Sequence, residues 1–471
     1  MAPDPNVTSA ANTGSTIADT TDAAPAASST GSTNSTNRLI QIPESEWNAM
    51  QADLTQIKTQ LETDRKAAAD KKAQEAQKKH TSPQTKFGAR FYLDVAGDSQ
   101  NDDAVALTGQ DTTGAKFREI RCWLRGSLYD TLEYNYTLEF CDKKTTMKDM
   151  YAGLYNTPTG VDFRVGHFFE PWSIEEISTS GPHPFMERSP VRNMQSLCGG
   201  RNIGLMFHNW HDADRFTWAA GAFVSSMTEE FTNFTVDSNL AFTTRLTFLP
   251  FYCENAEKNL FFWHLGAAYS YRHYNQEAAA TSGTSVSVRP GANLASAVLK
   301  TGTMWGLESM NALQVETCLC YGSFSIDAEQ TIYFLNDDYC GNATIQGGYV
   351  LASWFLTGES RNYQKAGAKF VAVDPREPFV DFSNPGVFCG MGAWELAYRF
   401  SWLDFSELVS GYDAGGLLGK SWSHTIGLNW YWCKNCRVMF NYVNTKTDYA
   451  GRNAGKTGIV DVVETRFQVA F

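Results

Sequence analysis

The sequence lacks any run of about 18 predominantly apolar residues, which is the minimum for a transmembrane helix. Its longest uncharged apolar stretch, around 345–358, is shorter and contains Gln346 and Ser353. A helical membrane protein is therefore excluded. Charged residues make up only 19% of the chain, below the roughly 25% of soluble domains. The 13% aromatic content and 37 glycines favour many short strands with large apolar faces.

The sequence also argues against several classes of function. A formal charge of −12 argues against a nucleic-acid partner, which would require a basic surface. There is no G-x-S-x-G, H-E-x-x-H or phosphate-binding P-loop motif. We therefore expect no enzyme activity, no cofactor and no dedicated metal site.

The ten cysteines do not form a recognisable metal or redox pattern. Cys433 and Cys436 make the sequence C-K-N-C at a tight turn, where a disulfide across the hairpin is conceivable. A single pair cannot complete a four-ligand zinc site. The sequence does not determine which of the ten cysteines pair with one another.

The N-terminus has neither the basic segment nor the apolar core of a secretory signal. We assume that a signal has been removed and that the protein is exported. Residues 1–38 are rich in Ala, Ser and Thr with almost nothing to bury, so we expect a disordered segment.

Residues 39–80 change to a helical pattern. Apolar residues recur at steps of three, four and seven between charged flanks, for example at Leu54, Ile57 and Leu61. This predicts a helix over 44–79 that forms a coiled-coil stalk with other chains, the alternative being a lone solvated helix. A linker at 81–86 would follow.

From residue 87 to residue 471 the apolar residues alternate with polar ones. Ile326 and Phe334 fall on one face of a strand, whereas Asp327 and Glu329 fall on the other. This pattern is typical of a barrel with lipid outside and water inside. A soluble sandwich shows the same local alternation, but the many Trp and Tyr residues near strand ends favour membrane interfaces.

We therefore predict an all-β fold, a 16-stranded antiparallel transmembrane β-barrel with an N-terminal helical coiled-coil stalk. Its connections alternate between short and long, as in bacterial outer-membrane barrels. The stalk would then lie in the periplasm, and the insert at 358–390 would lie on the same side. The predicted strands are 87–96, 117–128, 133–141, 147–156, 161–169, 201–210, 215–225, 240–251, 260–272, 311–321, 323–335, 344–357, 391–403, 420–432, 436–446 and 461–471.

Arginines on the inner faces would form an anion pathway. Arg presents five N–H donors and stays charged, and several spaced guanidiniums allow an oxyanion to move between moderate sites. Alternatively, these arginines pair with inward carboxylates such as Asp94 and Glu139 and brace the wall; we expect about half to do so. The pathway candidates are Arg90, Arg121, Arg125, Arg164, Arg201, Arg245, Arg272, Arg399, Arg437 and Arg466.

The third long loop, 170–200, is the predicted constriction. Within it, Arg188 and Arg192 would form an eyelet with Arg201 and arginines of the wall. Its carboxylates could instead dominate and favour cations. The acidic residues of the loop are Glu170, Glu175, Glu176 and Glu187.

Six stretches of the sequence resemble those of a known family, and the resemblance spans nearly all of 87–471. The chain resembles the phosphate-selective porin O and P family, which implies a homotrimeric outer-membrane pore lined by arginines. The family usually has a basic residue where Phe169 stands. The stretches are VGHFFEPWSIEEISTSGPHPFMERS, GRNIG, FLTGESRNY, GAWELAYRFSWLDF, and TIGLNWYW together with RVMFNYV.

The expected function is thus a diffusion channel in the bacterial outer membrane. Its expected partners are phosphate, other oxyanions or chloride, the lipid of that membrane, and two further copies of the chain. Two alternatives stay open. One is a general, sugar-permeable or cation-permeable porin, and the other is a structural protein that contacts the cell wall through its stalk.

Overall fold

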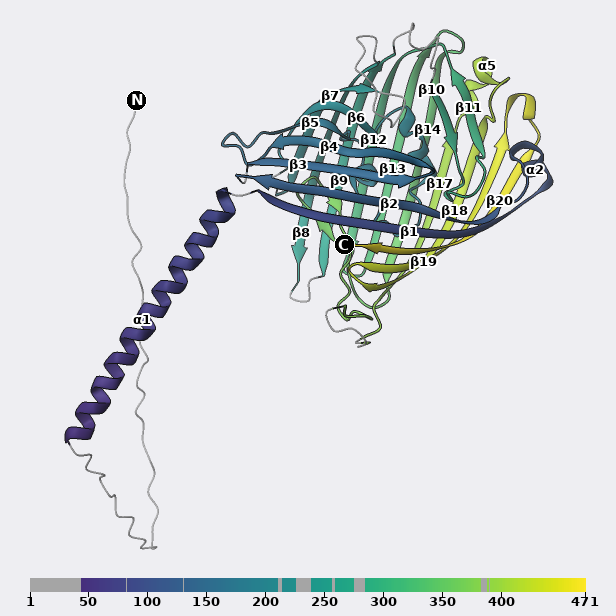
Figure 1. The fold of residues 1–471 in the computed structure, drawn as a ribbon. Coiled ribbons are helices and arrows are strands. Elements are labelled where there is room, and N and C mark those ends of the chain that lie inside the picture. Colours follow the sequence, from purple (N-terminus) through teal and green to yellow (C-terminus); the bar gives the residue numbers. More distant parts are fainter. Residues whose placement is uncertain are drawn as a thin grey trace, which may run out of the picture. The chain divides into compact units, whose positions relative to one another are not determined.

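A computed structural model describes residues 44–81, 83–129, 131–210, 214–225, 239–255, 259–274, 284–382, 388 and 390–471. Most of these residues form one closed antiparallel barrel, in which each strand pairs with its neighbours along the chain (Figure 1). The sixteen barrel strands are β1 (Gln84–Gln100), β2 (Thr113–Leu128), β3 (Leu132–Cys141), β4 (Lys144–Leu154), β5 (Asp162–Phe169), β6 (Arg201–His208), β7 (Phe216–Ser225), β8 (Asn239–Glu254), β9 (Leu260–His273), β12 (Leu307–Tyr321), β13 (Phe324–Asp337), β14 (Gly341–Phe355), β17 (Ala393–Asp404), β18 (Gly419–Cys433), β19 (Cys436–Tyr449) and β20 (Thr457–Ala470).

The barrel closes where its last strand pairs with its first. The β1–β20 register runs from Arg90 opposite Ala470 to Gln100 opposite Val460. Phe471 adds two backbone hydrogen bonds with Ala89, of 2.8 and 2.9 Å. We call this end of the barrel the chain-end rim, and the opposite end, with most of the long connections, the loop rim. The predicted barrel and its strand number are confirmed, and each predicted strand corresponds to one observed strand.

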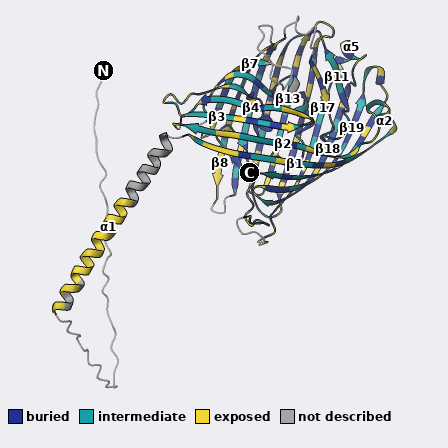
Figure 2. Cartoon of the chain, in the orientation of Figure 1, coloured by how far each residue is buried: buried dark blue, intermediate teal, exposed yellow. Residues whose placement is uncertain are grey.

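The alternation of the sequence becomes the two faces of the wall. On β13 the outward Phe324, Ile326 and Phe334 are 39–44% exposed, whereas the inward Asp327 and Glu329 are 2% and 6% exposed. Figure 2 shows this change between buried and exposed residues along each strand. An apolar outer face can contact hydrocarbon, and the inner face carries the polar residues that define the lumen.

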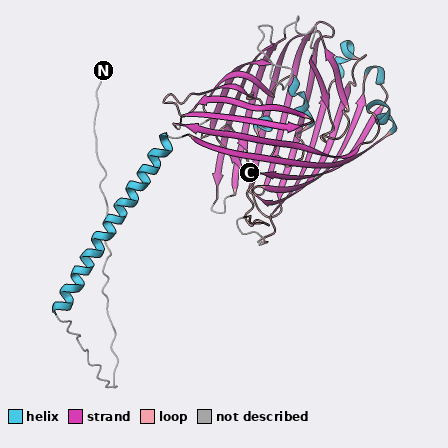
Figure 3. Cartoon of the chain, viewed as in Figure 1, coloured by secondary structure: helices cyan, strands magenta, loops and turns pink. Residues whose placement is uncertain are grey.

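Shorter elements occupy the long connections (Figure 3). Two small hairpins lie within segments that the sequence predicted as loops, 273–310 and 358–390. The short elements are α2 (Asp102–Thr108), α3 (Ile174–Ile177), η1 (Pro190–Ser196), β10 (Thr284–Val288), β11 (Leu299–Met304), β15 (Tyr363–Gln364), β16 (Lys369–Phe370), η2 (Ser406–Leu408), α5 (Val409–Tyr412) and η3 (Gly451–Asn453).

Loop three, residues 170–200, folds into the lumen from the loop rim. Its Met194 and Leu197 pack with Val286 of the β10–β11 hairpin and with inward Met310 of β12. Apolar side chains of both loops thereby form a core inside the barrel, which fixes the loop in one position.

The insert between β14 and β17 enters the lumen from the chain-end rim. Tyr363 and Phe370 of its β15–β16 hairpin pack with Ile174 of loop three and with inward Phe262. Phe370 donates its backbone N–H to the Ser178 hydroxyl over 3.0 Å. The two inserts therefore meet inside the barrel and leave an open path along the opposite part of the wall.

Helix α1 spans Glu44–Thr81, close to the predicted 44–79. In the single chain its Leu54, Ile57 and Leu61 are 52–65% exposed, although they are apolar. The chain divides by its contacts into two units, Met1–Lys72 and Ala73–Phe471. Coiled-coil pairing and the predicted domain division stay predictions, and the segment 1–38 lies outside the described residues.

No helix among the described residues has the length and apolarity that a membrane span requires.

Candidate functional site: an arginine-lined constriction

Two connected cavities lie along the open part of the lumen. The inner cavity, of about 510 Å³, is lined by the inner faces of β1 to β4, by loop three and by the β18–β19 turn. The outer cavity, of about 350 Å³, lies between loop three and the segment 287–293 of the β10–β11 region. Together they form a path from the loop rim toward the chain-end rim.

The lining of the inner cavity is strongly cationic. Ten basic and four acidic side chains border it, an excess of six positive charges. The sum over the whole chain, −12, has the opposite sign. Because charges on a water-filled surface are screened within about 8 Å at physiological salt, the local excess governs an ion inside the cavity.

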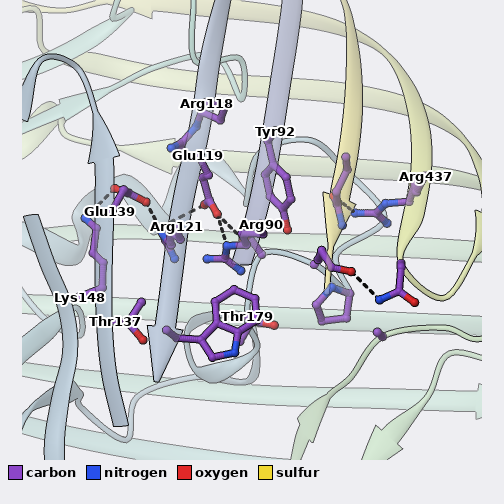
Figure 4. A pocket seen from close by; sticks show the side chains of 18 of the residues that line it. Arg90, Tyr92, Arg118, Glu119, Arg121, Thr137, Glu139, Lys148, Thr179 and Arg437 are labelled. Atoms are coloured by element: carbon purple, nitrogen blue, oxygen red, sulfur yellow. Dashed lines mark hydrogen bonds and ion pairs between the residues drawn. The ribbon is translucent and has the colours of Figure 1, made fainter. Parts of the chain in front are cut away.

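Three arginines line both cavities and so mark the passage between them: Arg118, Arg188 and Arg192. Arg118 belongs to β2, and the other two belong to loop three. Figure 4 shows Arg118 together with Arg90 and Arg121 at the inner cavity. We call Arg118, Arg188 and Arg192 the constriction arginines.

Loop three is held against the wall by Glu187. Arg118 donates to its carboxylate from Nε over 2.7 Å and from Nη2 over 3.0 Å, and Arg466 donates over 2.8 Å. These arginines lower the pKa of Glu187 to about 2 despite its burial. Arg399 also donates to the Glu187 carbonyl over 3.1 Å. Three barrel strands thus fix the residue that precedes Arg188.

Arg188 and Arg192 differ in their partners. Arg188 donates to the carbonyls of Glu175 over 2.9 Å and Ser178 over 2.6 Å. Burial and the neighbouring Arg192 lower the pKa of Arg188 to about 10, which keeps its guanidinium charged at neutral pH. Arg192 forms an ion pair with Glu176. Arg188 is therefore the less compensated of the two.

Arg118 was missed by the alternation because β2 has a bulge there. Tyr92 of β1 lies opposite Glu119 and Leu93 lies opposite Phe117, so Arg118 has no opposite residue. A bulge adds one residue to a strand and changes which face the side chains take. Arg118 and Glu119 consequently both reach the lumen, a position that strict alternation does not predict.

Most of the ten predicted pathway arginines lie near a carboxylate. Eight of them have a carboxylate oxygen within 4.0 Å, more than the expected half, and the other two are Arg125 and Arg437. The pairs are Arg90–Glu119, Arg121–Glu139, Arg164–Glu133, Arg201–Asp149, Arg245–Glu316, Arg272–Glu170, Arg399–Glu175 and Arg466–Asp94.

Only part of the predicted set borders the inner cavity. Arg90, Arg121, Arg125, Arg201 and Arg437 line it. The structure places Arg164, Arg245, Arg272, Arg399 and Arg466 outside the lining of both cavities. Arg245, for example, donates to the Ala368 carbonyl of the insert over 3.1 Å and so supports the hairpin.

The carboxylates of loop three are used within the protein. Glu170 binds Asn202 and Arg272, and Glu175 accepts from the backbone and hydroxyl of Ser189 over 2.7 Å. Glu176 accepts from the Gly200 backbone over 2.8 Å. Glu170 is also paired with Arg272 and Glu176 with Arg192, so the charges of these two carboxylates are compensated within the protein.

Phe169 stands beside Arg201 and Arg192. The Arg201 guanidinium lies 3.7 Å from the centre of its ring, and that of Arg192 lies 5.8 Å away. Arg201 also makes two 3.0 Å bonds to Asp149. The Phe169 ring therefore contacts the guanidiniums of Arg201 and Arg192 at the position where the family usually has a basic residue.

Within the part of the chain that the structure describes, there is no cluster of three His, Cys, Asp or Glu residues suited to a metal ion. Cys433 and Cys436 lie directly opposite each other at the β18–β19 turn and are free thiols.

Two curated proteins are similar to this chain in sequence. A curated relative, Porin O of Pseudomonas aeruginosa, is 25% identical over 417 residues, covering 82% of this chain and 88% of that protein. An uncharacterised protein of Caulobacter vibrioides is 23% identical over 375 residues, and the match covers 76% of this chain and 68% of that protein.

Solved structures with a similar arrangement include Pseudomonas putida OprB and an anion-selective porin from Comamonas acidovorans. The first has a TM-score of 0.49 and 10% identity, covering 82% of this chain and 94% of that one. The second has a TM-score of 0.47 and 13% identity, covering 83% and 100%.

The family model described as phosphate-selective porin O and P matches residues 90–471, which include all of the barrel except the start of β1. The chain belongs to the phosphate-selective porin O and P family, and its barrel is an outer-membrane porin.

Proposed function

We propose that the barrel passes small anions, and that the constriction arginines select them. The observation that carries the proposal is the excess of six positive charges around the inner cavity, with Arg118, Arg188 and Arg192 at its entrance. A desolvating passage lined by permanent donors favours an oxyanion over a cation. Phosphate, related oxyanions and chloride are the proposed ions, in keeping with the family description and with the name of the anion-selective structure.

The test is an ion-flux measurement on proteoliposomes that contain the purified protein. With the same salt on both sides, labelled chloride and labelled phosphate should exchange out of the vesicles faster than labelled potassium, so that no net charge moves. The double variant Arg188→Gln/Arg192→Gln should lose most of this preference. Arg215→Gln/Arg452→Gln removes two exposed arginines that line neither cavity and serves as the matched control. Equal fluxes of sugars in both proteins, with no ion preference, would support a general porin instead.

We also propose that three copies associate in the outer membrane. Strands β5 and β6 have eight residues each, fewer than the roughly 9–11 that a lipid-facing strand needs. A second copy packed against this low part of the wall would cover it. The exposed Leu54, Ile57 and Leu61 of α1 would pack in a three-stranded coil in the periplasm. Contact of that stalk with the cell wall is the accompanying structural proposal.

A further inference from the structure

Two cysteines face each other across the turn between β18 and β19, at the chain-end rim. Cys433 is the last residue of β18, Cys436 is the first residue of β19, and the two are directly paired in the antiparallel register. Directly paired residues of such a ladder have Cα atoms about 4.5–5.5 Å apart and side chains on the same face. A disulfide requires a Cα separation of about 4.4–6.8 Å, so the backbone already meets this requirement.

Both thiols can be reached from the lumen. Cys433 is half-buried and Cys436 is buried, and both border the inner cavity. Lys434 and Arg437 directly follow the two cysteines in the sequence and line the same cavity. Nearby cations favour the thiolate, which is the form of cysteine that attacks a disulfide. The pair is therefore close to a solvent path and in surroundings that favour its reaction.

The opposed arrangement is specific to this turn. In the strand ladders that the structure describes, the residues opposite the other cysteines are Leu138 opposite Cys122, Lys144 opposite Cys141, Phe261 opposite Cys253, Asp327 opposite Cys318 and Ser325 opposite Cys320. Cys318 and Cys320 are also enclosed in the packing around the β15–β16 hairpin. The register thus brings two thiols together at positions 433 and 436.

The turn joins three separate parts of the chain. The Ala470 N–H donates to the carbonyl of the turn residue Asn435 over 2.8 Å, which attaches the last strand. The Phe379 N–H of the insert donates to the Trp432 carbonyl over 2.7 Å. Arg437 donates to a carbonyl of loop three over 2.9 Å. A covalent bond across the turn would hold the acceptors of the first two bonds and the donor of the third in place.

We infer that Cys433 and Cys436 form a reversible disulfide that closes the β18–β19 turn in the exported protein. The chain-end rim of an even-stranded outer-membrane barrel lies in the periplasm, which is an oxidising compartment. The oxidant is a protein or small-molecule disulfide. One thiolate attacks it to give a mixed disulfide, and the second thiolate then displaces the bound thiol. The two cysteines lose two protons and two electrons, and the oxidant gains them as two thiols.

The inference does not rest on the proposed anion pathway. The bond depends on the register of β18 and β19 and on the compartment, whichever ion the pore prefers. Reduction of the bond should leave the sign of the reversal potential in a potassium chloride gradient unchanged, so the two proposals fail separately.

Thiol trapping tests the bond in the full-length protein. Outer membranes are dissolved in denaturant with an alkylating reagent, with or without prior reduction, and the peptides are identified by mass spectrometry. Cys433 and Cys436 should resist alkylation before reduction and accept it afterwards, and their peptides should be linked to each other. Cys253, which has no cysteine opposite, is the internal control and should be alkylated in both samples. Full alkylation of the pair without reduction, or a bond from either cysteine to any other, would overturn the inference.

Hydrogen exchange measures what the bond does. In Cys433→Ser/Cys436→Ser the backbone amides of Phe379 and Ala470 should exchange roughly tenfold faster, because their acceptor carbonyls lie on a turn that is no longer cross-linked. Reduction of the wild type should have the same effect. The Ala450 amide, which donates to the Leu418 carbonyl over 2.9 Å at the loop rim, should keep its rate. Equal exchange of oxidised and reduced protein would contradict the closing of the turn.

A reagent that bonds two neighbouring thiols gives a readout in the pore. Phenylarsine oxide exchanges its oxygen for two thiol sulfurs and releases water, so it requires the reduced pair. It should lower the single-channel conductance of the reduced wild type and leave the oxidised wild type and Cys433→Ser/Cys436→Ser unchanged.

The matched control is Cys318→Ala/Cys320→Ala, which removes two thiols that line neither cavity. This variant should respond to phenylarsine oxide as the wild type does. A reduced wild type whose conductance does not change with the reagent, or an oxidised wild type that is blocked equally, would contradict the assignment of the pair.

Discussion

Arg118 and Glu187 form a two-point ion pair, with Nε and Nη2 of Arg118 2.7 and 3.0 Å from the two carboxylate oxygens of Glu187. The pair joins the bulge of β2 to loop three. It places a cation of the wall beside Arg188 of the loop, at the passage between the two cavities. The same carboxylate reduces the positive charge of that passage.

Neutralising Glu187 should therefore increase the preference for anions. In Glu187→Gln the backbone contact from Arg399 and the apolar packing of Met194 and Leu197 remain, so loop three stays in place. One unit charge about 4 Å from an ion contributes roughly 1 kcal/mol in water, with opposite signs for an anion and a cation. The anion-to-cation permeability ratio should therefore rise roughly thirtyfold, the equivalent of about 2 kcal/mol. Reversal potentials in a salt gradient measure it. The exposed Glu254→Gln at the end of β8 is the control, and a lower ratio in Glu187→Gln would contradict the role of Glu187.

The pH dependence of selectivity follows from the lowered pKa of Glu187. Because its folded-state pKa is about 2, below the ordinary 4.5, the carboxylate stabilises the loop fully above pH 4.5. This contribution is lost as pH falls through about 2. The selectivity of wild-type channels should therefore be constant from neutral pH to about pH 4. A transition centred near pH 4.5 that is absent in Glu187→Gln would show that Glu187 is not held by its arginines.

Removing the β15–β16 hairpin should widen the pore. The hairpin accepts hydrogen bonds from Arg245 and meets loop three at Ser178. Replacing residues 362–371 with a glycine-serine linker should raise single-channel conductance, because a packed segment leaves the lumen. Gln364→Ala, at an exposed hairpin position, should leave conductance unchanged. An unchanged conductance in the linker variant would show that the hairpin does not limit the current.

Deleting residues 1–80 removes the stalk and should leave the conduction of the pore unchanged. The barrel unit contains all of the cavity-lining residues, so conductance and reversal potential should match the full-length protein. If α1 forms a coil between subunits, the temperature at which trimers dissociate on an electrophoresis gel should fall. Loss of current from a folded, truncated barrel would contradict the independence of the two parts.

The barrel was predictable because lipid imposes one rule on every strand. Residues such as Ile326 and Phe334 must face hydrocarbon, which gives a period of two that a single sequence displays. The same rule predicted that Arg90, Arg121 and Arg437 face inward. Arg118 was not predictable in this way, because a bulge interrupts the period.

The pairing of the arginines depends on register between strands. Arg90 lies directly opposite Arg121, and Glu119 bonds to both over 2.6 and 3.2 Å. One strand's sequence does not reveal which residue lies opposite on the next, so the number of compensated arginines was underestimated. The meeting of the insert with loop three likewise depends on contacts between distant segments.

The reversal potential of the wild-type protein in a potassium chloride gradient is the most direct test of the anion pathway. Single channels of the purified, full-length protein should reverse near the chloride equilibrium potential, because Arg118, Arg188 and Arg192 border the passage. Reversal near the potassium equilibrium potential would contradict the account.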